Sequence, residues 1–252
     1  MGGMIKAMIF DLDGTIYIGK TAVPGAIDKI KELRKKDVKT IFLTNAATMS
    51  RKGIAEKLQN MGFDVQENEC YGGAYLLARY ISQEHPGKSV YVVGEKGIFE
   101  ELEKVGVKTA DEADIVVAGL DRHFTYEKLA KAHRNLSKGA LFIASNLDPT
   151  FPTEEGSMPG AGSIVAAIEK GSGKAPYVVV GKPNPFVLEL IENDHGVKKE
   201  EMLMVGDRIE TDIHFAHNCG IKAALVLSGV TKKENIKEKV DYVFDSVADL
   251  EF

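Results

Sequence analysis

Two aspartates near the start of the chain have the type and spacing for metal or proton chemistry. Asp11 and Asp13 follow the apolar stretch 4–10, and Gly14 comes directly after them. The short apolar stretch predicts a buried parallel strand. Because side chains alternate along a strand, two residues two positions apart can face one pocket beyond its end. Neighbouring carboxylates repel unless a cation or a proton separates them, which favours a metal site or acid–base catalysis. An ordinary aspartate-rich turn is the alternative.

Three later stretches also place polar side chains just after apolar runs. They are Thr44 and Asn45 after residues 38–43, Lys182 after residues 177–180, and Asp207 after residues 202–205. Taken singly, the Thr–Asn pair fits a helix cap, the lysine a solvated loop, and the aspartate a turn. In an open parallel sheet, however, ligands bind beyond the carboxyl ends of the strands. We therefore expect the four stretches to converge on one site.

Apolar runs alternate with amphipathic segments along the chain, which predicts an α/β fold with a doubly wound, Rossmann-like parallel sheet. After the first strand, we expect a hairpin at 16–23, helices at 24–36 and 50–61, and further strands at 38–43, 177–180, 202–205, 223–227 and 242–244. The middle of the chain repeats the alternation, with strands at 89–94, 114–119 and 140–144 and helices at 97–105 and 126–136. A single sheet of all these strands is the alternative. Since the strands with distinctive ends lie on both sides of this middle stretch, we predict a core of residues 1–78 and 177–252. A smaller α/β domain, residues 79–176, is then inserted into it.

Composition excludes several classes of partner. The 252 residues carry a net charge of −5, with 44% hydrophobic and 27% charged residues, as in ordinary globular proteins. Nothing in this balance favours a nucleic acid polymer or a membrane as partner. The N-terminal residues have no apolar signal segment, and Cys70 and Cys219 are too few for a disulfide framework. We expect reduced cysteines and a cytoplasmic protein.

The polar residues at the strand ends together have the chemistry of phosphoryl transfer. Carboxylate oxygens suit Mg²⁺ rather than zinc. A cation beside a lysine and loop amides can receive a dianionic phosphoryl group. Phosphoryl transfer needs an in-line nucleophile and a proton for the leaving oxygen. Two aspartates can supply both: one attacks phosphorus to form an acyl phosphate, and the other protonates the leaving alkoxide and then deprotonates water.

Four motifs, in this order along the chain, resemble those of the haloacid dehalogenase (HAD) superfamily. They are Asp-Leu-Asp-Gly-Thr at 11–15, Leu-Thr-Asn at 43–45, Gly-Lys-Pro-Asn-Pro at 181–185, and Gly-Asp-Arg-Ile-Glu-Thr-Asp at 206–212. The middle stretch resembles the large α/β (C2-type) cap of the NagD-like, 4-nitrophenylphosphatase branch. This second resemblance lies in residues 119–121, 124–129, 146–149 and 159–164.

The resemblance implies a role for each residue that matches a motif. It implies that Asp11 is the nucleophile and that Asp13 is the general acid and base. Mg²⁺ would be held by the Asp11 carboxylate, by the main-chain carbonyl of Asp13 and by Asp207, and Asp212 would act through a water or orient these ligands. The resemblance further implies that the phosphoryl oxygens are bound by Thr44, Asn45 and Lys182. An aspartate at position 13 favours a phosphatase, because the dehalogenase branch lacks an acid there and needs none for a halide leaving group. Ala46 and Ala47 depart from the family pattern, where relatives often carry a second Asn and a small hydroxyl residue.

The cap must contact the leaving group, because the catalytic loops grip only the phosphoryl end. Asn146 and Asp148, after the strand 141–144, are the specificity candidates, and Arg122 and His123 are weaker ones. A turn before Pro149 is the alternative for the Asn–Asp pair. Caps of this type often pair, so the resemblance leaves a homodimer open.

The expected function is Mg²⁺-dependent hydrolysis of small phosphorylated metabolites through an aspartyl phosphate. Two alternatives remain at this point. One is a phosphotransferase or mutase acting on a sugar phosphate, in which a substrate hydroxyl replaces water. The other is a regulator that binds phosphate without turnover. The physiological substrate is open, with nucleoside monophosphates, sugar phosphates and small acid phosphates all compatible with the motifs.

Overall fold

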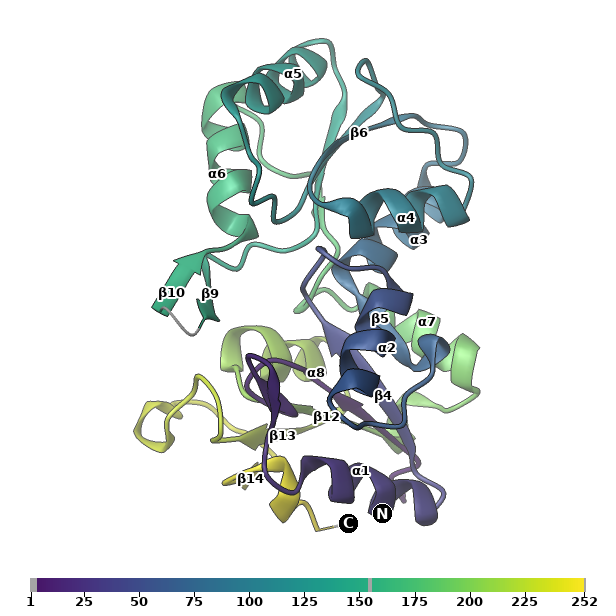
Figure 1. Cartoon of the computed structure of the whole chain (residues 1–252), viewed down its shortest axis with the longest axis vertical. Coiled ribbons are helices and arrows are strands. Elements are labelled where there is room, and N and C mark those ends of the chain that lie inside the picture. Colours follow the sequence, from purple (N-terminus) through teal and green to yellow (C-terminus); the bar gives the residue numbers. More distant parts are fainter. Residues whose placement is uncertain (1–3, 154–155, 252) are drawn as a thin grey trace. The chain divides into compact units, whose positions relative to one another are not determined.

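A computed structural model describes residues 4–153 and 156–251 (Figure 1). The chain forms two compact units. The first comprises Met1–Thr44, Ala55–Tyr71 and Lys182–Phe252, and the second comprises Asn45–Ile54 and Gly72–Gly181. Compactness does not show which parts fold on their own, so the expected domain boundaries, 1–78 with 177–252 and 79–176, stay a prediction. Within the described ranges, none of the helices has both the length and the apolar character required to cross a bilayer.

The first unit is built on a six-stranded sheet in the order β14-β13-β12-β1-β4-β5. Its strands are β1 (Ala7–Phe10), β4 (Lys39–Thr44), β5 (Cys70–Gly72), β12 (Met202–Gly206), β13 (Lys222–Val226) and β14 (Tyr242–Phe244). The central strand β1 runs parallel to both neighbours, with Ile9 opposite Ile41 of β4 and Met204 of β12. These three side chains are completely buried, because the central strands have helices on both faces.

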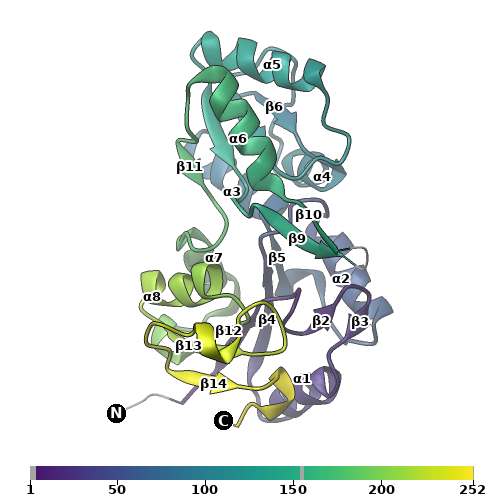
Figure 2. The ribbon, with the colours of Figure 1, turned by 90° about the vertical axis from the view of Figure 1, so that its left-hand side faces the viewer.

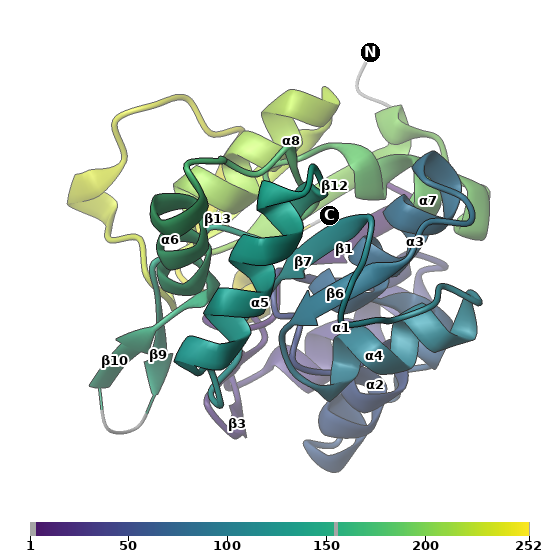
Figure 3. The ribbon, with the colours of Figure 1, turned by 90° about the horizontal axis from the view of Figure 1, so that it is seen from above.

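Helices cover both faces of this sheet. Helix α1 (Ala26–Lys35) lies on one face, and α7 (Phe186–His195) and α8 (His214–Cys219) lie on the other (Figure 3). Helix α1 buries Ala26, Ile30 and Leu33, which share one side at helical spacing. Helix α2 (Arg51–Asn60) begins in the second unit and ends in the first. The predicted α/β class with a parallel sheet is confirmed.

The second unit has its own four-stranded sheet in the order β11-β8-β7-β6, and all its neighbouring strands are parallel. Its strands are β6 (Val90–Val93), β7 (Ile115–Ala118), β8 (Leu141–Ala144) and β11 (Val178–Val179). Helices α3 (Gly73–Glu84) and α4 (Lys96–Lys104) lie on one face, and α5 (Tyr126–Ser137) and α6 (Ala161–Ser172) lie on the other (Figures 2 and 3).

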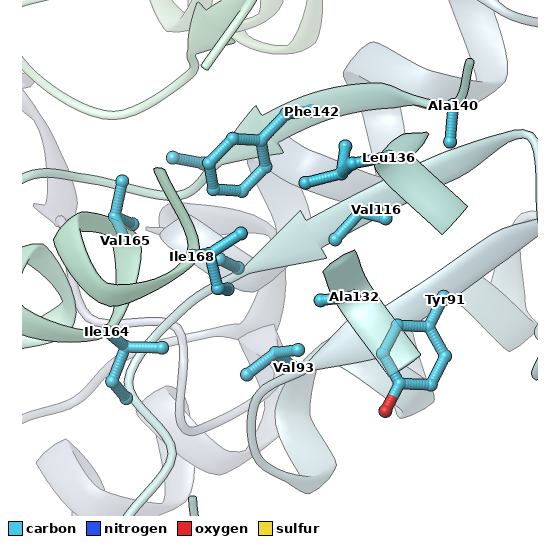
Figure 4. Packing of buried hydrophobic residues seen from close by; sticks show 12 residues of the cluster. Tyr91, Val93, Val116, Ala132, Leu136, Ala140, Phe142, Ile164, Val165 and Ile168 are labelled. Atoms are coloured by element: carbon cyan, nitrogen blue, oxygen red, sulfur yellow. The ribbon is translucent and has the colours of Figure 1, made fainter. Parts of the chain in front are cut away.

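Alternate residues of this second sheet form a core with α5 and α6 (Figure 4). Val93, Val116 and Phe142 point from three neighbouring strands toward Leu136 of α5 and Ile168 of α6, and all five are nearly inaccessible to solvent. The alternation of buried faces is what a strand covered by helices on both sides requires. A β-hairpin, β9 (Thr150–Thr153) with β10 (Gly156–Pro159), precedes α6.

One strand lies in a different sheet from the one expected. The stretch 177–180 was expected as a strand of the core sheet, but β11 pairs with β8, with Val178 opposite Ile143 and Val179 opposite Ala144. The prediction was wrong because an apolar run of valines fits any buried parallel strand, and only pairing decides which sheet receives it. Lys182 therefore follows a strand of the second sheet, not of the first.

Several elements were not predicted or have shorter bounds than expected. Strand β1 begins at Ala7 rather than at position 4, because Met4 is 81% exposed and outside the core. Helix α3 was not predicted, since buried residues occupy most of its length and its sequence shows no clear polar face.

The remaining elements of the chain are short. They are β2 (Tyr17–Ile18), β3 (Thr21–Ala22), the 3₁₀ turns Glu67–Glu69, Lys199–Glu201, Lys233–Asn235 and Val247–Asp249, and a π-helical turn at Ile209–Ile213. Strands β2 and β3 form the predicted hairpin.

Candidate active site

The order of strands in the first sheet reverses at β1, which is where such sheets bind ligands. β4 lies on one side of β1, and β12 lies on the other. Asp11 follows β1, Thr44 ends β4, and Asp207 follows β12. The main-chain N–H of Asp11 donates to the carbonyl of Val205 at 2.8 Å, so the ladder between β1 and β12 continues as far as the first aspartate.

A buried lysine links two of the aspartates. Lys182 Nζ donates to Asp11 Oδ1 at 2.5 Å and to Asp212 Oδ1 at 2.6 Å, and it also reaches the carbonyl of Leu43 at 3.4 Å. Its side chain is only 2% exposed. An ammonium group removed from water in this way needs anionic partners, and these two carboxylates supply them.

Two hydrogen bonds between side chains and the main chain hold the segment that directly follows Lys182. Asn184 Oδ1 accepts a hydrogen bond from the N–H of Phe186 at the start of α7, at 2.9 Å. Asn218 Nδ2 of α8 donates to the carbonyl of Pro183, also at 2.9 Å. The lysine is therefore presented to the aspartates by an anchored turn, although the strand before it belongs to the other sheet.

Asp212 is held in place by the π-helical turn on which it lies. Its Oδ2 accepts hydrogen bonds from the main-chain N–H groups of Asp207 and Arg208 at 3.2 and 3.1 Å, while its Oδ1 accepts from Lys182. Both carboxylate oxygens of Asp212 are therefore already engaged. π-helical turns are frequent at functional sites, and here the turn directs a buried carboxylate back toward the end of β12.

A loop that was not named among the site residues encloses Asp207. The N–H of Val230 donates to Asp207 Oδ2 at 2.6 Å, and Ser228 Oγ donates to the carbonyl of Gly14 at 2.7 Å. A Cβ at either Gly14 or Gly229 would overlap with the Asp207 carboxylate, and Gly14 also has a φ of +89°. Position 228 follows β13, at the same sheet edge as the other candidates, and this placement is the signal that could have identified the loop.

Three carboxylates gather closely enough to share one cation. One oxygen each of Asp11, Asp207 and Asp212 lies within 4.8 Å of the others. Within the described part of the chain, Val230 is the only protein group that donates to the Asp207 carboxylate, and it does so to Oδ2. Buried oxygen ligands with an excess of negative charge over the single lysine fit a hard divalent cation such as Mg²⁺.

Burial and mutual repulsion shift the proton affinities of this cluster. Burial raises the pKa of Asp207 to about 6, and repulsion from Asp212 adds to the increase. Burial also raises the pKa of Asp11 well above its ordinary value, with Lys182 opposing the increase. For Lys182, burial alone would lower the pKa, but the Asp11 and Asp212 carboxylates raise it above its ordinary value. The lysine therefore stays charged, and a proton or a cation is needed among the carboxylates.

Asp13 has an environment of its own. Tyr17 donates its hydroxyl hydrogen to Asp13 Oδ2 at 2.9 Å, and Lys57 Nζ lies 3.9 Å from the centre of the Tyr17 ring. Surrounding protein atoms raise the pKa of Asp13 by desolvation, and Lys57 opposes this. Neither Tyr17 nor Lys57 was identified from the sequence, because neither belongs to a polar motif.

The remaining candidates lie in the second unit, where they contact one another. Asn146 Nδ2 donates to the carbonyl of Asn45 at 2.8 Å and to Ser145 Oγ at 3.2 Å, and its Oδ1 accepts from the N–H of Asp148. Asn45 Nδ2 donates to Asp148 Oδ2 at 3.3 Å. Asn146 is only 4% exposed, and both polar atoms of its side chain form hydrogen bonds within the protein. Asn146 therefore supports the loop at Asn45. Contacts of Asn146 and Asp148 with a leaving group stay a prediction.

The two weaker cap candidates and the two alanines have plain structural environments. Arg122 forms a two-pronged ion pair with Glu95, at 2.8 and 2.7 Å. The main-chain N–H of His123 donates to Asp121 Oδ1 at 2.9 Å. Ala47 is buried, and a Cβ on Gly73 would lie 3.2 Å from its Cβ. The small residue at this departure from the family pattern therefore allows the loop to pack against the start of α3.

Comparisons with known proteins agree with this architecture. A family model described as haloacid dehalogenase-like hydrolase matches residues 8–108, and a second, described as HAD-hydrolase-like, matches residues 179–250. The chain is 37% identical over 236 residues to an acid sugar phosphatase of Staphylococcus aureus, covering 93% of this chain and 91% of the relative. The solved 4-nitrophenylphosphatase of Thermotoga maritima matches with a TM-score of 0.93 and 36% identity, covering 97% of this chain and 95% of that one. NagD of E. coli K-12 matches with a TM-score of 0.90 and 32% identity, covering 99% of both chains.

Proposed function

Because the chain belongs to the haloacid dehalogenase-like hydrolases, we propose that it is a phosphatase that cleaves small phosphate monoesters through an aspartyl phosphate. The observation that carries this proposal is the buried cluster at the end of β1. There Lys182 contacts Asp11, and one carboxylate oxygen of Asp207 lies within 4.8 Å of one of Asp11. This arrangement offers a nucleophile, a site for a cation and a fixed positive charge within reach of one phosphoryl group.

In the first step, a carboxylate oxygen of Asp11 attacks phosphorus. A bond forms between this oxygen and phosphorus, the bond to the leaving oxygen breaks, and the leaving oxygen takes the electron pair of that bond together with a proton from Asp13. Lys182 offsets charge on the phosphoryl oxygens and keeps Asp11 oriented through the 2.5 Å hydrogen bond. Thr44 and Asn45 are the further donors that we assign to the phosphoryl oxygens.

In the second step, Asp13 takes a proton from water as the water oxygen attacks phosphorus. The bond between Asp11 and phosphorus breaks, which regenerates the carboxylate and releases inorganic phosphate. The same residue thus serves first as acid and then as base, as the reversal of roles in a two-step transfer requires. Asp13 suits both roles because it is solvent-exposed, so that a leaving oxygen and a water molecule can reach its carboxyl group.

Mg²⁺, when bound, would neutralise charge on the phosphoryl group and help to align it with the nucleophile. Asp11, Asp207 and the main-chain carbonyl of Asp13 are the groups that we assign to it. Asp212 has both oxygens occupied by Lys182 and by main-chain N–H groups, which supports an orienting role.

The substrate class follows from the proposed reaction and from the relatives. One relative is named for sugar phosphates and others for 4-nitrophenyl phosphate, and both kinds of substrate are small phosphate monoesters. We propose that a small phosphorylated metabolite is the substrate, and that Asn146 and Asp148 influence which leaving group is accepted.

The direct test is release of inorganic phosphate with Mg²⁺ present. We expect the protein to release phosphate from 4-nitrophenyl phosphate and from members of a sugar phosphate panel, and chelation of Mg²⁺ to lower the rate by at least about 10²-fold. Restoring Mg²⁺ should restore the rate. Phosphate transferred to a sugar hydroxyl without free phosphate would instead favour a phosphotransferase. Tight phosphate binding without turnover on the whole panel would contradict the proposal and favour a regulator.

The raised pKa of Asp207 predicts how metal-free protein responds to pH. The pKa is about 6 in the folded protein and near 3.8 otherwise, so the folded state binds this proton more tightly than the unfolded state. The stabilising effect of the protonated form is lost as pH rises through 6, and the full difference corresponds to about 3 kcal/mol. We therefore expect Asp207→Asn to unfold at a higher temperature than the parent in chelator at pH 7.5, with a smaller advantage at pH 5.

Mg²⁺ should reverse this order, because the cation needs the ionised carboxylate. At pH 7.5 the parent should gain thermal stability from Mg²⁺, and Asp207→Asn should gain much less. The matched control is Asp241→Asn, since Asp241 also accepts a main-chain hydrogen bond, from Ala223 at 3.0 Å, but lies outside the cluster. Scanning calorimetry of the three proteins at both pH values measures the effect. An equal pH response of Asp207→Asn and the parent would contradict the assignment.

A further inference from the structure

Tyr17 is a buried phenol that contacts the exposed Asp13, and the mechanism above assigns it no role. Its hydroxyl donates to Asp13 Oδ2 at 2.9 Å, while the residue as a whole is only 2% exposed. A neutral phenol is a hydrogen-bond donor at neutral pH, and its ring is too well packed to turn away from the carboxylate. The contact is therefore a fixed feature of the loop.

The backbone of this loop fixes the distance between the two side chains. The N–H of Gly14 donates to the carbonyl of Tyr17 at 2.8 Å, and the N–H of Tyr17 donates to the carbonyl of Leu12 at 3.3 Å. The chain thus closes on itself directly after Asp13, and β2 begins at Tyr17. A residue four positions after the aspartate returns to contact it because of this closure.

Lys57 fixes the other side of the phenol. Its Nζ lies 3.9 Å from the centre of the Tyr17 ring, which is a cation–π distance. Lys57 lies on α2, which is distant in sequence from the loop that carries Asp13 and Tyr17. This helix therefore contacts the Tyr17 ring, and the Tyr17 hydroxyl contacts the Asp13 carboxylate. Asp13 is therefore the end of a chain of contacts that runs from α2 through the tyrosine.

We propose that Tyr17 is a positioning residue for the proton donor of the reaction. It fixes Oδ2 of Asp13 as a hydrogen-bond acceptor, so that Oδ1 carries the proton that goes to the leaving oxygen. Lys57 supports Tyr17 in this arrangement. The inference rests on the proposed function, in which Asp13 is the general acid and base, and it adds the group that decides which of its two oxygens acts.

The chemistry of a carboxylic acid explains why one fixed oxygen matters. The carbonyl oxygen of a neutral carboxyl accepts hydrogen bonds, and the other oxygen carries the hydrogen. While the bond between phosphorus and the leaving oxygen breaks, the proton moves from Oδ1 to the leaving oxygen, and the Asp13 carboxyl becomes an anion. A hydrogen bond to an anion is stronger than one to a neutral group, so the Tyr17 contact strengthens as the proton leaves. Tyr17 thus lowers the barrier to cleavage of the bond between phosphorus and the leaving oxygen. The effect is larger for a more basic leaving oxygen, because its departure requires more complete proton transfer from Asp13.

The dependence on the leaving group provides the test. We would measure kcat/KM of Tyr17→Phe and the parent, with Mg²⁺, for 4-nitrophenyl, 4-chlorophenyl and phenyl phosphate, in order of increasing basicity of the leaving oxygen. The ratio of variant to parent for each substrate cancels differences in substrate binding. General acids contribute about 10²–10⁴-fold, and we expect loss of this one orienting bond to lower kcat/KM about 10-fold for phenyl phosphate and less than about 3-fold for 4-nitrophenyl phosphate.

Two further variants separate positioning from packing. Tyr71→Phe is the matched control, because Tyr71 is a fully buried tyrosine of the same unit whose hydroxyl donates to Asp194 at 2.7 Å. It should change all three ratios equally and little. Lys57→Met removes the charge but keeps an apolar stem beside the ring, and it should give the trend of Tyr17→Phe with a smaller amplitude. If thermal unfolding shows Tyr17→Phe to be unfolded, the Lys57→Met series decides.

The outcomes distinguish this inference from the function on which it rests. Asp13→Asn should show the steepest dependence on the leaving group and sets the reference. An equal loss by Tyr17→Phe on all three substrates, or no loss, would overturn the positioning role while the parent still hydrolyses the esters. Absence of phosphate release by the parent on every substrate would overturn the proposed function itself.

Discussion

Asp11→Asn is expected to release phosphate from 4-nitrophenyl phosphate at least about 10⁴-fold more slowly than the parent. The amide has the shape of the carboxylate but cannot form an acyl phosphate under these conditions. The replacement also removes one negative charge from the cluster in which Lys182 contacts both Asp11 and Asp212. Because burial and neighbouring carboxylates disfavour that charge, we expect the metal-free variant to unfold at no lower a temperature than the parent.

Two measurements make this prediction specific to a covalent nucleophile. Rapid acid quenching during turnover should trap phosphate on the parent protein and none on Asp11→Asn. Asp241→Asn, an aspartate of the same unit outside the cluster, should keep parental rates. An Asp11→Asn protein that retains more than a tenth of the parental rate would show that another group attacks phosphorus, and the aspartyl phosphate would have to be abandoned.

The architecture was largely predictable because the spacing of apolar residues marks the helices and strands of this chain, and glycine and polar residues mark where they end. Strands such as β12 are continuous apolar runs that end at a glycine and an aspartate, and helices such as α1 bury one side at regular spacing. Parallel strands with helices between them leave few topologies. The end of β1 as the ligand edge followed from the same rule, because the strand order reverses there.

Long-range pairing and apolar helices were the parts that local patterns could not supply. Strand β11 was assigned to the wrong sheet because its valines pair equally well with any parallel neighbour, and the pairing with β8 depends on the tertiary fold. Helix α3 has seven buried residues, so its sequence lacks the polar side that marks a helix at a surface.

The sequence could predict those candidate site residues whose charged or polar side chains are unusual at their positions. It could not predict residues that are distinguished only by their contacts in the folded chain. Asp11, Lys182 and Asp207 are charged residues after apolar runs, a pattern that a core does not explain. Tyr17 and Lys57 carry no such mark, because a tyrosine in a short hairpin and a lysine on an amphipathic helix are ordinary residues. The role proposed for them rests on two distances that only the folded chain defines, 2.9 Å from the Tyr17 hydroxyl to the Asp13 carboxylate and 3.9 Å from Lys57 Nζ to the centre of the Tyr17 ring.

Lys182→Met is expected to have the largest combined effect on stability and activity. Removal of one partner of a buried ion pair leaves its counterpart uncompensated, at a cost of about 3 kcal/mol or more. Here two buried carboxylates, Asp11 and Asp212, would lose the same ammonium group. Loss of a fixed positive charge at the phosphoryl oxygens should also slow turnover by about 10³-fold. Calorimetry in chelator and phosphate release with Mg²⁺ measure the two effects separately.

The electrostatic origin of the stability loss can be tested with pH and with a second substitution. Burial raises the pKa of Asp11, so at pH 5 its orphaned carboxyl group can take up a proton, and Lys182→Met should lose less stability there than at pH 7.5. The double variant Asp11→Asn with Lys182→Met removes one of the unpaired charges and should recover part of the lost stability, but no activity. Lys39→Met, which removes an exposed lysine that donates to the carbonyl of His195 at 2.7 Å, is the control and should be nearly neutral. A pH-independent loss that the double variant does not recover would mean that Lys182 acts by packing its stem, and the buried cluster would then not be the source of its stabilising effect.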